Sequence, residues 1–511
     1  MNSIHTDVVV VGAGIAGLTT AVRLSEQGVT ALVLERGEQG YMCNTRMAGG
    51  AFHVAHQDVA DDSQLILRAI TSRTGDSAPA ELVEALASDI GEATQWLKRQ
   101  GVRFIKVGHE SYRKHTLAPP IATRGREYWL GRGGDVLLRT LTGALEKQGG
   151  RILHGARATR LTMRDSACVG LVAESTRGPM DIDARAVVIC DGGFHSNLEL
   201  LREFISPAPE KLKQRNAQTG YGDGLRMARE AGAKLVGLNR FYGHVLAQDA
   251  MHNDDLWPFP MMDFLCAAGI VVDQSAKRFA NEGLGGVTIA NTIAAQTDPL
   301  GATVIFDADI WNGPGREYLI SANPTLVSSG GTLYSAADLA GLASQVGLAA
   351  DTLLQTVAQY NAAVDGGSTG NLEPTRSTDG YRAWPIRKAP FYAVKLCAGI
   401  TYTMGGIAID ADGRVLDTAN RPIANLYAAG CATGGIEGGG DREQVAYIGG
   451  LSRSTVFGLR AANAIASRWS RREASASDRQ SMYRTLWRIC VTAPVSLPIV
   501  EYHLCKPKSN R

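Results

Sequence analysis

The sequence has few of the residues that mark metal sites or membrane spans. Its eight cysteines are scattered, with no C-x-x-C pair and no clustering with the ten histidines at zinc-ligand spacing. No apolar run reaches the ~18 residues that a membrane-spanning helix requires. These absences predict no metal site and no membrane span, and the cysteine pattern favours a reducing compartment.

An excess of charge of one sign is also lacking. Lys and Arg total 52 and Asp and Glu total 50, which gives a formal net charge of +2. Such a balance provides no electrostatic field to gather nucleic acid or an anionic membrane. Residues 1–6 are too short for a targeting leader, because the first buried strand begins at Val8. We therefore expect a cytoplasmic protein whose partner is a small molecule, with no nucleic-acid partner.

Glycine is abundant instead. The 511 residues contain 58 glycines, while 45% hydrophobic and 20% charged residues are typical of a folded interior. Residues 7–36 predict strand, glycine turn, helix and strand, a unit that nucleates a parallel sheet. Further strand patterns at 151–154, 168–173 and 186–190 are expected to extend that sheet.

The composition changes in the middle of the chain. Trp257, several prolines and a helical pattern over 336–364 follow residue 234. Apolar, glycine-rich strand patterns like those before residue 234 resume at 403–409 and 426–430. The sequence therefore predicts an α/β fold in which a Rossmann-like domain is interrupted by an α+β domain. The expected boundaries are 1–233 and 389–470 for the first domain, 234–388 for the second, and 471–511 for a C-terminal tail.

The glycine turn has the spacing of a dinucleotide-binding motif. Gly12, Gly14 and Gly17 form a G-x-G-x-x-G between a strand and a helix, and Glu35 ends the next strand. The three glycines allow a tight turn, close approach of a pyrophosphate, and packing of helix on strand. Glu35 is expected to accept hydrogen bonds from a ribose.

A second glycine cluster favours FAD over NAD. It runs from Tyr427 to Gly435, and Gly449-Gly450-Leu451-Ser452 then opens a predicted helix. Two distant glycine sites indicate a long ligand, such as an FAD that extends from the first turn to the domain boundary. Only one G-x-G-x-x-G is present, so we expect electrons to leave to an external acceptor of unknown kind.

Several further motifs occur in a telling order. They are Asn44-Thr45-Arg46-Met47-Ala48-Gly49-Gly50-Ala51-Phe52, Gly222-Asp223-Gly224, Gly269 to Asp273 followed by Arg278-Phe279-Ala280-Asn281-Glu282, and Thr403-Met404-Gly405-Gly406. Over roughly residues 5–467 the chain resembles the fumarate reductase/succinate dehydrogenase flavoprotein family. The asparagine motif is most similar to tricarballylate dehydrogenases, and the later tyrosine-glycine element is similar to 3-ketosteroid dehydrogenases.

The resemblance implies an FAD domain capped by a substrate domain, with hydride passing between flavin N5 and a substrate carbon. Succinate-oxidising members attach FAD through a histidine near the position of Asn44, and Cys43, Asn44 and Thr45 offer none. We therefore expect noncovalent FAD. The predicted FAD contacts are Gly12, Ala13, Gly14, Ala16, Gly17, Glu35, Arg36, Asn44, Thr45, Gly49, Gly50, Ala158, Asp191, Gly192, Asp223, Gly405, Gly430, Leu451 and Ser452.

The chain departs from the fumarate reductase pattern at several places. The proton-delivering arginine five residues after the motif asparagine is replaced by Gly286, and the histidine before T-M-G-G is replaced by Tyr402. No arginine lies in 445–452, although Arg442 and Arg453 flank that stretch. Cys431 replaces a family glutamate that binds the ribityl chain. These departures argue against fumarate as the substrate.

The candidate catalytic residues come from the tyrosine-glycine element and the start of the second domain. The Tyr447 hydroxyl and the Gly450 N–H are expected to hold a ketone oxygen as negative charge develops there. His244 is the preferred base, because its pKa needs little tuning to act near neutrality, and Tyr242 is the alternative. Tyr402 is expected to line the flavin face. The leading hypothesis is an FAD-dependent dehydrogenase that introduces a C=C bond next to the carbonyl of a cyclic ketone or keto acid.

Three other hypotheses stay open. One is a dehydrogenase of di- or tricarboxylates, or a fumarate or enoate reductase, with carboxylate contacts from Arg46, Arg124, Arg126 and Arg132. Another is a flavin-bound redox carrier or partner-docking protein whose tail over 471–511 mediates assembly. A hydroxylating flavoprotein is the third, and it would need NAD(P)H to reduce its flavin.

Overall fold

The structure is a computed structural model that describes residues 2–121, 129–318 and 320–469. The chain divides into a large unit, Met1–Ala464, and a small unit, Ile465–Arg511. Of the small unit only residues 465–469 are described, and they are helical. The predicted tail over 471–511 and two candidate arginines, Arg124 and Arg126, lie outside the described residues.

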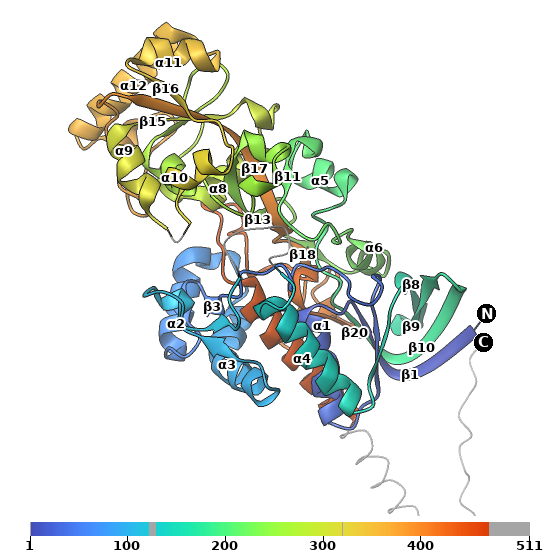
Figure 1. The fold of residues 1–511 in the computed structure, drawn as a ribbon. Coiled ribbons are helices and arrows are strands. Elements are labelled where there is room, and N and C mark those ends of the chain that lie inside the picture. Colours follow the sequence, from blue (N-terminus) through green and yellow to red (C-terminus); the bar gives the residue numbers. More distant parts are fainter. Residues whose placement is uncertain (1, 122–128, 319, 470–511) are drawn as a thin grey trace, which may run out of the picture. The chain divides into compact units, whose positions relative to one another are not determined.

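A mainly parallel sheet forms the first part of the large unit (Figure 1). The strand order is β19-β20-β9-β10-β1-β2-β7, with β8 paired to β9. The strands β20, β10, β1, β2 and β7 run parallel to one another, whereas β9 pairs antiparallel with β8 and with β10, which follows it through a tight hairpin. The strands are β1 Asn2–Val11, β2 Ala31–Leu34, β7 Arg151–Leu153, β8 Arg157–Arg164, β9 Ala167–Ser175, β10 Gly178–Ile189, β19 Arg414–Leu416 and β20 Pro422–Ala428.

This sheet confirms the strands expected at 151–154, 168–173 and 186–190, all of which join it. Val8, Val9 and Val10 are completely buried, as a strand covered on both faces requires. Helix α1 (Ile15–Glu26) leaves the glycine turn and packs against α4 (Gly133–Lys147). A last helix covers residues 450–469. The other helices of this part are α2 Ser63–Thr74, α3 Ala80–Arg99, α5 Leu198–Phe204 and α6 Asp223–Glu230.

A second sheet is built around one long strand, β17 (Phe391–Thr403). It pairs with β11 (Lys213–Gln214) on one side, and with β13 (Phe241–Ala247), β15 (Thr303–Asp307) and β16 (Tyr334–Ala336). Strand β14 (Ile270–Val272) pairs with β15. The sheet thus includes residues on both sides of the predicted 234–388 boundaries, which stay predictions. Two-stranded ribbons complete the strands: β3 His53–Val54 with β4 Gln57–Asp58, β5 Phe104–Ile105 with β6 Thr116–Leu117, and β12 Leu235–Val236 with β18 Gly406–Ile407.

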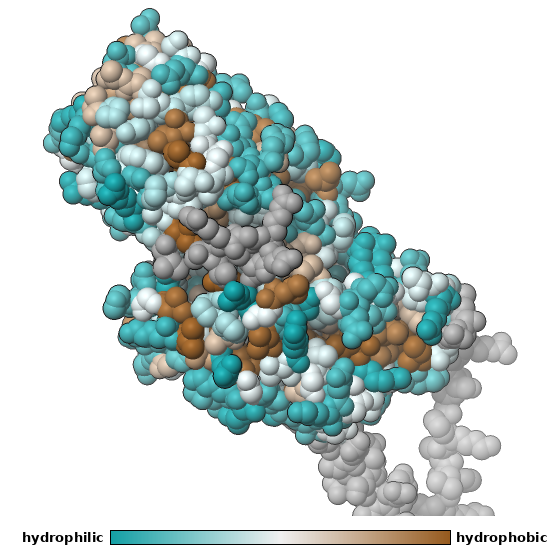
Figure 2. Space-filling view, viewed as in Figure 1, coloured by the Kyte–Doolittle hydropathy of each residue, from teal (hydrophilic) through white to brown (hydrophobic). Residues whose placement is uncertain are grey.

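Short helices surround the second sheet. The helical pattern expected over 336–364 is divided by Gly347, whose φ of +82° ends one helix in a left-handed conformation that glycine adopts without strain. On the face shown in Figure 2, apolar residues form small separate patches in a hydrophilic surface. No helix in the described ranges is long and apolar enough to span a bilayer. The helices are α7 Asp263–Ala268, α8 Gly286–Ala294, α9 Ala308–Asn312, α10 Ala322–Ser328, α11 Leu339–Val346 and α12 Ala350–Asp365.

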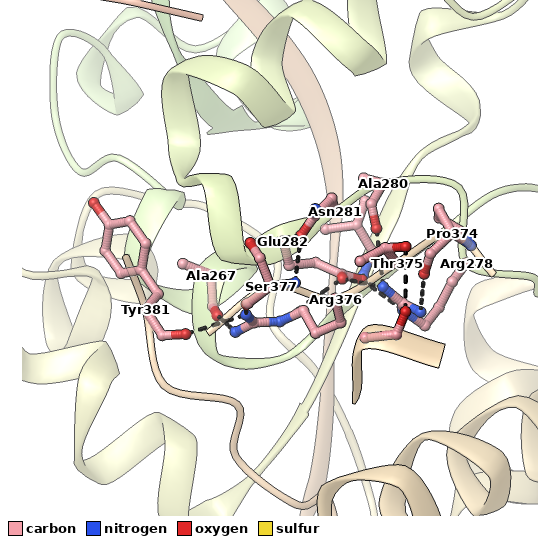
Figure 3. Close-up of polar contacts among 12 residues, drawn as sticks. Ala267, Arg278, Ala280, Asn281, Glu282, Pro374, Thr375, Arg376, Ser377 and Tyr381 are labelled. Atoms are coloured by element: carbon pink, nitrogen blue, oxygen red, sulfur yellow. Dashed lines mark hydrogen bonds and ion pairs between the residues drawn. The ribbon is translucent and has the colours of Figure 1, made fainter. Parts of the chain in front are cut away.

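The R-F-A-N-E motif builds a buried ion cluster in this second region (Figure 3). Glu282 is fully buried and accepts a hydrogen bond from the Val271 N–H and a bidentate pair from Arg278. Arg376 is also fully buried, lies 3.9 Å from the Glu282 carboxylate, and donates to the backbone oxygens of four residues. Those oxygens belong to Ala267, Ser377, Tyr381 and Arg382. The motif therefore fixes the chain around 374–382 rather than facing a ligand.

Candidate active site

A cavity of about 360 Å³ lies at the carboxyl ends of the central parallel strands. It extends from Glu35 and Arg36, after β2, to Gly430 and Cys431, after β20. Both glycine clusters singled out in the sequence thus contribute to one cavity. Ligands of open α/β sheets bind at this edge, where the strand order changes direction.

The glycine turn has the geometry of a phosphate-binding loop. Gly12 has a φ of +97°, and a Cβ there would lie 2.6 Å from the Cys190 oxygen, while a Cβ on Gly17 would lie 1.9 Å from the Gly12 oxygen. Gly14 differs, because a Cβ there would meet only the Thr45 Oγ1, at 3.5 Å. Two glycines therefore serve packing, and the third leaves the backbone open toward the cavity.

The acidic residues beside the turn are half-buried. Glu35 accepts hydrogen bonds from the Ala13 N–H at 3.0 Å and the Gly37 N–H at 2.8 Å, and burial raises its pKa. Asp191 accepts one from the Gly224 N–H at 2.6 Å, and burial raises its pKa to about 7. Asp223 is held by Arg157 through two bonds, of 2.8 and 2.6 Å.

Several buried polar atoms have no hydrogen-bond partner among the described residues. They include Asp191 Oδ1 and His195 Nδ1 in residues that line the cavity, and Ser452 Oγ near the start of the helix over 450–469. Buried polar groups without partners are rare in native proteins unless a ligand or water completes them. FAD carries a pyrophosphate, several hydroxyls and a polar ring edge, so the residues present fit it.

Most of the predicted FAD residues lie together. The cavity is lined by Gly12, Ala13, Gly14, Ala16, Glu35, Arg36, Asn44, Thr45, Ala158, Asp191, Gly192, Asp223 and Gly430. The predicted contacts that do not line it are Gly17, Gly49, Gly50, Gly405, Leu451 and Ser452. Gly405 packs against the backbone of Gly237, and Gly50, with a φ of +86°, packs against Leu117. A direct FAD contact stays a prediction for the residues that line the cavity and for these six.

The predicted catalytic tyrosines and histidine form one cluster beyond the cavity. The rings of Tyr447 and Tyr242 are stacked with centroids 4.0 Å apart, and Tyr402 lies 5.3 Å from Tyr242. The Tyr242 hydroxyl is 3.0 Å from His244 Nε2. The Asn44 side chain, which lines the cavity, donates to the backbone oxygen of Thr401, one residue before Tyr402. Cavity and cluster are thus connected through adjacent residues.

Asp263, which the sequence reasoning missed, orients His244. Its Oδ2 lies 2.6 Å from His244 Nδ1, and its Oδ1 accepts from the Val245 N–H at 2.9 Å. The substitution to Gly286 makes room for this carboxylate, since a Cβ on residue 286 would lie 2.0 Å from the Asp263 Cγ. Burial lowers the pKa of His244 and the Asp263 charge opposes that shift, so His244 is neutral at pH 7.

A second buried acid, Glu437, holds Tyr402 and the turn before Gly450. It accepts from the Tyr402 hydroxyl at 3.1 and 3.2 Å, and from the N–H groups of Ile448 and Gly449. Arg453 forms an ion pair with it at 3.1 Å, with both side chains almost fully buried. Arg453 is therefore committed to a carboxylate of the protein. Glu437 lies in this network and does not line the FAD cavity, so it does not replace the glutamate missing at Cys431.

Two histidines near Tyr447 were also missed. His53 and His56 lie 5.4 and 6.0 Å from the Tyr447 ring and stack on each other at 5.2 Å. Burial lowers the pKa of His53 to about 3 and that of His56 to about 4, so both are neutral. Their position directly after the asparagine motif was the signal available in the sequence.

The arginines expected to contact a carboxylate are used differently. Arg46 lies 3.1 Å from Asp135 in a buried ion pair, and is thus already neutralised. Arg215, which the sequence reasoning did not consider, lies closer to the tyrosine cluster. No group of three or more His, Cys, Asp or Glu side chains that can hold a metal ion occurs in the part of the chain that the structure describes.

Comparisons with known proteins agree with this geometry. Residues 7–443 match a family model described as FAD binding domain. The chain is 25% identical over 444 residues to a probable fumarate reductase, Ifc3, of Shewanella frigidimarina, covering 85% of this chain and 71% of that protein. It is 26% identical over 514 residues to the 4-oxocyclohexanecarboxylate 2-dehydrogenase of Sinomonas cyclohexanicum, covering 84% and 87%.

Other relatives are much longer. The NADH:acrylate oxidoreductase of Vibrio harveyi is 29% identical over 375 residues, which are 70% of this chain but 34% of that protein. Among solved structures, the 3-ketosteroid-delta4-(5alpha)-dehydrogenase of Rhodococcus jostii has a TM-score of 0.67 at 22% identity, covering 91% of this chain and 97% of that one. That likeness confirms the predicted α/β fold with its FAD-binding domain. The chain therefore belongs to the FAD binding domain family, as an FAD-dependent oxidoreductase of the fumarate reductase/succinate dehydrogenase flavoprotein kind.

Proposed function

We propose that this oxidoreductase is a dehydrogenase that introduces a C=C bond next to the carbonyl of a cyclic ketone or keto acid. The observation that carries the proposal is the stack of Tyr447 on Tyr242, whose hydroxyl meets the Nε2 of His244. This stack brings a hydrogen-bond donor for the substrate's carbonyl oxygen, Tyr447, close to the proton acceptor, Tyr242 with His244. Desaturation needs a donor at the carbonyl oxygen and a proton acceptor at the adjacent carbon.

Tyr447 and Gly450 are assigned to the carbonyl oxygen. Burial raises the pKa of Tyr447 well above its usual value, so the hydroxyl keeps its proton and can donate it to an oxygen in a hydrogen bond. Gly450 begins the helix over 450–469, and its N–H has no acceptor among the described residues. Two such donors stabilise the negative charge of an enolate and thereby acidify the adjacent C–H.

Tyr242 and His244 are assigned to the proton as a pair. The Nδ1–H of His244 donates to Asp263, which leaves the lone pair of Nε2 facing the Tyr242 hydroxyl. Tyr242 can accept the substrate proton on its oxygen while passing its own proton to Nε2. Asp263 then stabilises the imidazolium that forms. Bound FAD supplies the hydride acceptor.

The same geometry counts against a dicarboxylate substrate. Arg453 is paired with Glu437, and the place of a proton-delivering arginine at residue 286 is filled by the Asp263 carboxylate. One relative of similar length is a dehydrogenase whose name specifies an oxo acid, 4-oxocyclohexanecarboxylate. This supports a ketone over a dicarboxylate. We further propose that FAD is noncovalent, because Cys43, Asn44 and Thr45 contain no histidine.

The Tyr447→Phe variant tests the proposal. A panel of cyclic ketones, keto acids and di- or tricarboxylates first identifies compounds that bleach the flavin of the wild-type protein anaerobically. Single-turnover flavin reduction is then compared between wild type and variant at equal FAD occupancy. Loss of one donor to a developing oxyanion should slow reduction roughly 100- to 1000-fold.

The control is Tyr334→Phe, which removes a hydroxyl from β16 in the second sheet and should leave the rate unchanged. If the rate of flavin reduction in Tyr447→Phe stays within about threefold of wild type, the loss is far smaller than that expected for an oxyanion donor. That result would remove Tyr447 from the mechanism. Bleaching by dicarboxylates alone would instead support the carboxylate-linked alternative.

A further inference from the structure

Arg215 lies at the junction of β11 and β17. Its backbone N–H donates to the Ile400 oxygen at 2.8 Å, directly after the parallel pairing of Gln214 with Ile400. On the other side of β17, Tyr402 pairs with Tyr242. The sheet thus places Arg215 one strand away from the proposed proton acceptor.

The guanidinium of Arg215 is held at one edge and has donors to spare. Nη1 donates to Thr401 Oγ1 at 3.0 Å, and Nε and Nη2 donate to the Pro258 oxygen at 3.4 and 3.2 Å. A guanidinium has five N–H groups, so one remains on each terminal nitrogen. In the described parts of the chain, the only further acceptor is the weakly accepting Met261 Sδ, 4.0 Å from Nη2. Two N–H groups on neighbouring nitrogens match the two oxygens of a carboxylate.

Arg215 differs from the buried arginines of this chain in having no acid. Arg46 is paired with Asp135, Arg278 with Glu282, and Arg453 with Glu437. For Arg215 no carboxylate lies within 4.0 Å in the described parts of the chain. A half-buried cation without an anion is costly to fold, and this cost is recovered when an anionic ligand binds.

The charge of Arg215 acts on the proposed catalytic residues. Burial lowers its pKa, and the groups that oppose this shift are Tyr242, Tyr318, Asp263 and Tyr447. Arg215 in turn contributes to the lowered pKa of His244. Its guanidinium also lies 5.8 Å from the Phe259 ring. The cation therefore lies close enough to Tyr242, Asp263 and Tyr447 to interact with them electrostatically, and the Phe259 ring beside it offers an apolar contact.

We propose that Arg215 is an anion-binding residue that holds the carboxylate of the substrate, which makes the substrate a keto acid rather than a neutral ketone. The carboxylate accepts hydrogen bonds from both terminal nitrogens, while the carbonyl lies at Tyr447. This assignment rests on the proposed function for the position of the carbonyl. The anion site itself can be tested without any reaction.

Binding of cyclohexanecarboxylate, which has no ketone, tests the anion site. Calorimetric titration of the FAD-loaded protein should show binding by wild type and an affinity reduced about 10- to 100-fold in Arg215→Met, the loss typical of a charge-assisted hydrogen-bonded pair. Arg215→Lys keeps the charge without the two-nitrogen fork and should bind with intermediate affinity. Arg202→Met removes an exposed arginine paired with Glu210 and should change nothing.

Single-turnover reduction separates specificity from structure. The compounds are 4-oxocyclohexanecarboxylate and its methyl ester, which presents the same ketone without the charge. In Arg215→Met, the limiting rate of flavin reduction divided by the substrate Kd should fall for the acid about as much as the affinity, roughly 10- to 100-fold, and the same ratio for the ester should stay unchanged. An equal loss for both compounds would show a structural role and overturn the assignment.

The outcomes also separate this inference from the proposed function. If neither ketone bleaches the flavin but cyclohexanecarboxylate binds in an Arg215-dependent manner, the desaturation fails and the anion site stands. The anion site fails if both ketones react and the affinity of Arg215→Met for cyclohexanecarboxylate stays within about threefold of wild type. Such a change is smaller than the loss of one charge-assisted hydrogen bond would cause. Should Arg215→Met not retain FAD, the comparison of acid with ester in Arg215→Lys decides by the same criterion.

Discussion

Two clusters of charged residues in the second region differ in how completely they are satisfied. Around Glu282, two arginines and a backbone N–H surround one carboxylate, and Arg376 also donates to four backbone oxygens (Figure 3). Around His244 the groups also have defined partners, but part of the hydrogen-bonding capacity is unused among the described residues. Among the described residues, Arg215 retains two N–H groups whose only near acceptor is the Met261 Sδ, and Tyr447 is half-buried.

The difference separates a motif that identifies the family from the residues to which we assign the chemistry. Arg278, Asn281 and Glu282 belong to the motif that placed the chain in its family, yet their polar groups are consumed within the protein. A group that already has all its partners gains nothing from a substrate. We therefore assign the reaction to the part of the molecule where hydrogen-bonding capacity is left over.

Arg376→Met should have the largest effect, and it should be on stability. The substitution leaves four backbone oxygens without a donor and removes one cation from the buried Glu282, so the free energy of unfolding should fall by about 3–5 kcal/mol. Urea denaturation of the FAD-loaded protein measures it. The exposed Arg382, over the Trp384 ring, provides the control variant Arg382→Met.

Arg376→Met should reduce its flavin with the keto acid and with its ester in the same rate ratio as wild type, because the cluster around Glu282 faces no ligand. A change of less than about 1 kcal/mol in unfolding free energy would contradict a structural role for the buried cluster around Glu282.

Asp263→Asn should have the next largest effect, and it should be on the rate. The variant removes the charge that stabilises the imidazolium of His244, so flavin reduction should slow roughly 100-fold. His244 accepts a proton only when neutral, and its pKa lies below the ordinary 6.5. The wild-type rate should therefore decline only below that pH. Because Asp263 raises the pKa of His244, its removal should move the decline to still lower pH.

Single-turnover reduction between about pH 5 and pH 9 measures both effects. The control variant is Asp249→Asn. The Asp249 carboxylate accepts hydrogen bonds from Thr332 and not from His244, so this variant should reduce its flavin at the wild-type rate. If the decline in rate at low pH moves to higher pH in Asp263→Asn, a group other than His244 causes that decline.

The sequence predicted the cofactor side of the molecule well, for a physical reason. The tight turn at Gly12 and the close packing of Gly17 on Gly12 each exclude a side chain, so the pattern records the backbone geometry directly. The central strands β1 and β2 likewise show their burial as unbroken apolar runs, at 8–11 and 31–34. Such local constraints can be derived from consecutive residues.

The substrate side was predicted only in part, because its contacts join distant residues. His244 meets Asp263 across 19 positions, and Arg215 meets Thr401 across 186. No local pattern marks either pair. The absence of an arginine at Gly286 was visible, but its consequence, room for the Asp263 carboxylate, depends on how α7 and α8 pack.

The glycine turn contains the same contrast between satisfied and open positions, at a smaller scale. A side chain at residue 17 collides with the Gly12 oxygen, whereas Gly14 has an extended backbone, with φ of −72° and ψ of −178°, that alanine also adopts. Gly14→Ala should therefore fold normally. Its added methyl group would intrude on the cavity where a pyrophosphate approaches the backbone. Affinity for FAD should fall about tenfold, the loss of roughly one charge-assisted hydrogen bond.

Titration of the apoprotein with FAD, followed by quenching of flavin fluorescence, measures that affinity. The matched control is Gly143→Ala on α4, where an added Cβ meets nothing within 4 Å, and it should bind FAD as wild type does. Thermal unfolding of both variants without FAD should stay close to wild type, since neither methyl group meets a close neighbour. An unchanged FAD affinity in a folded Gly14→Ala protein would mean that Gly14 does not face the pyrophosphate. The open space at this glycine would then not indicate where the ligand binds.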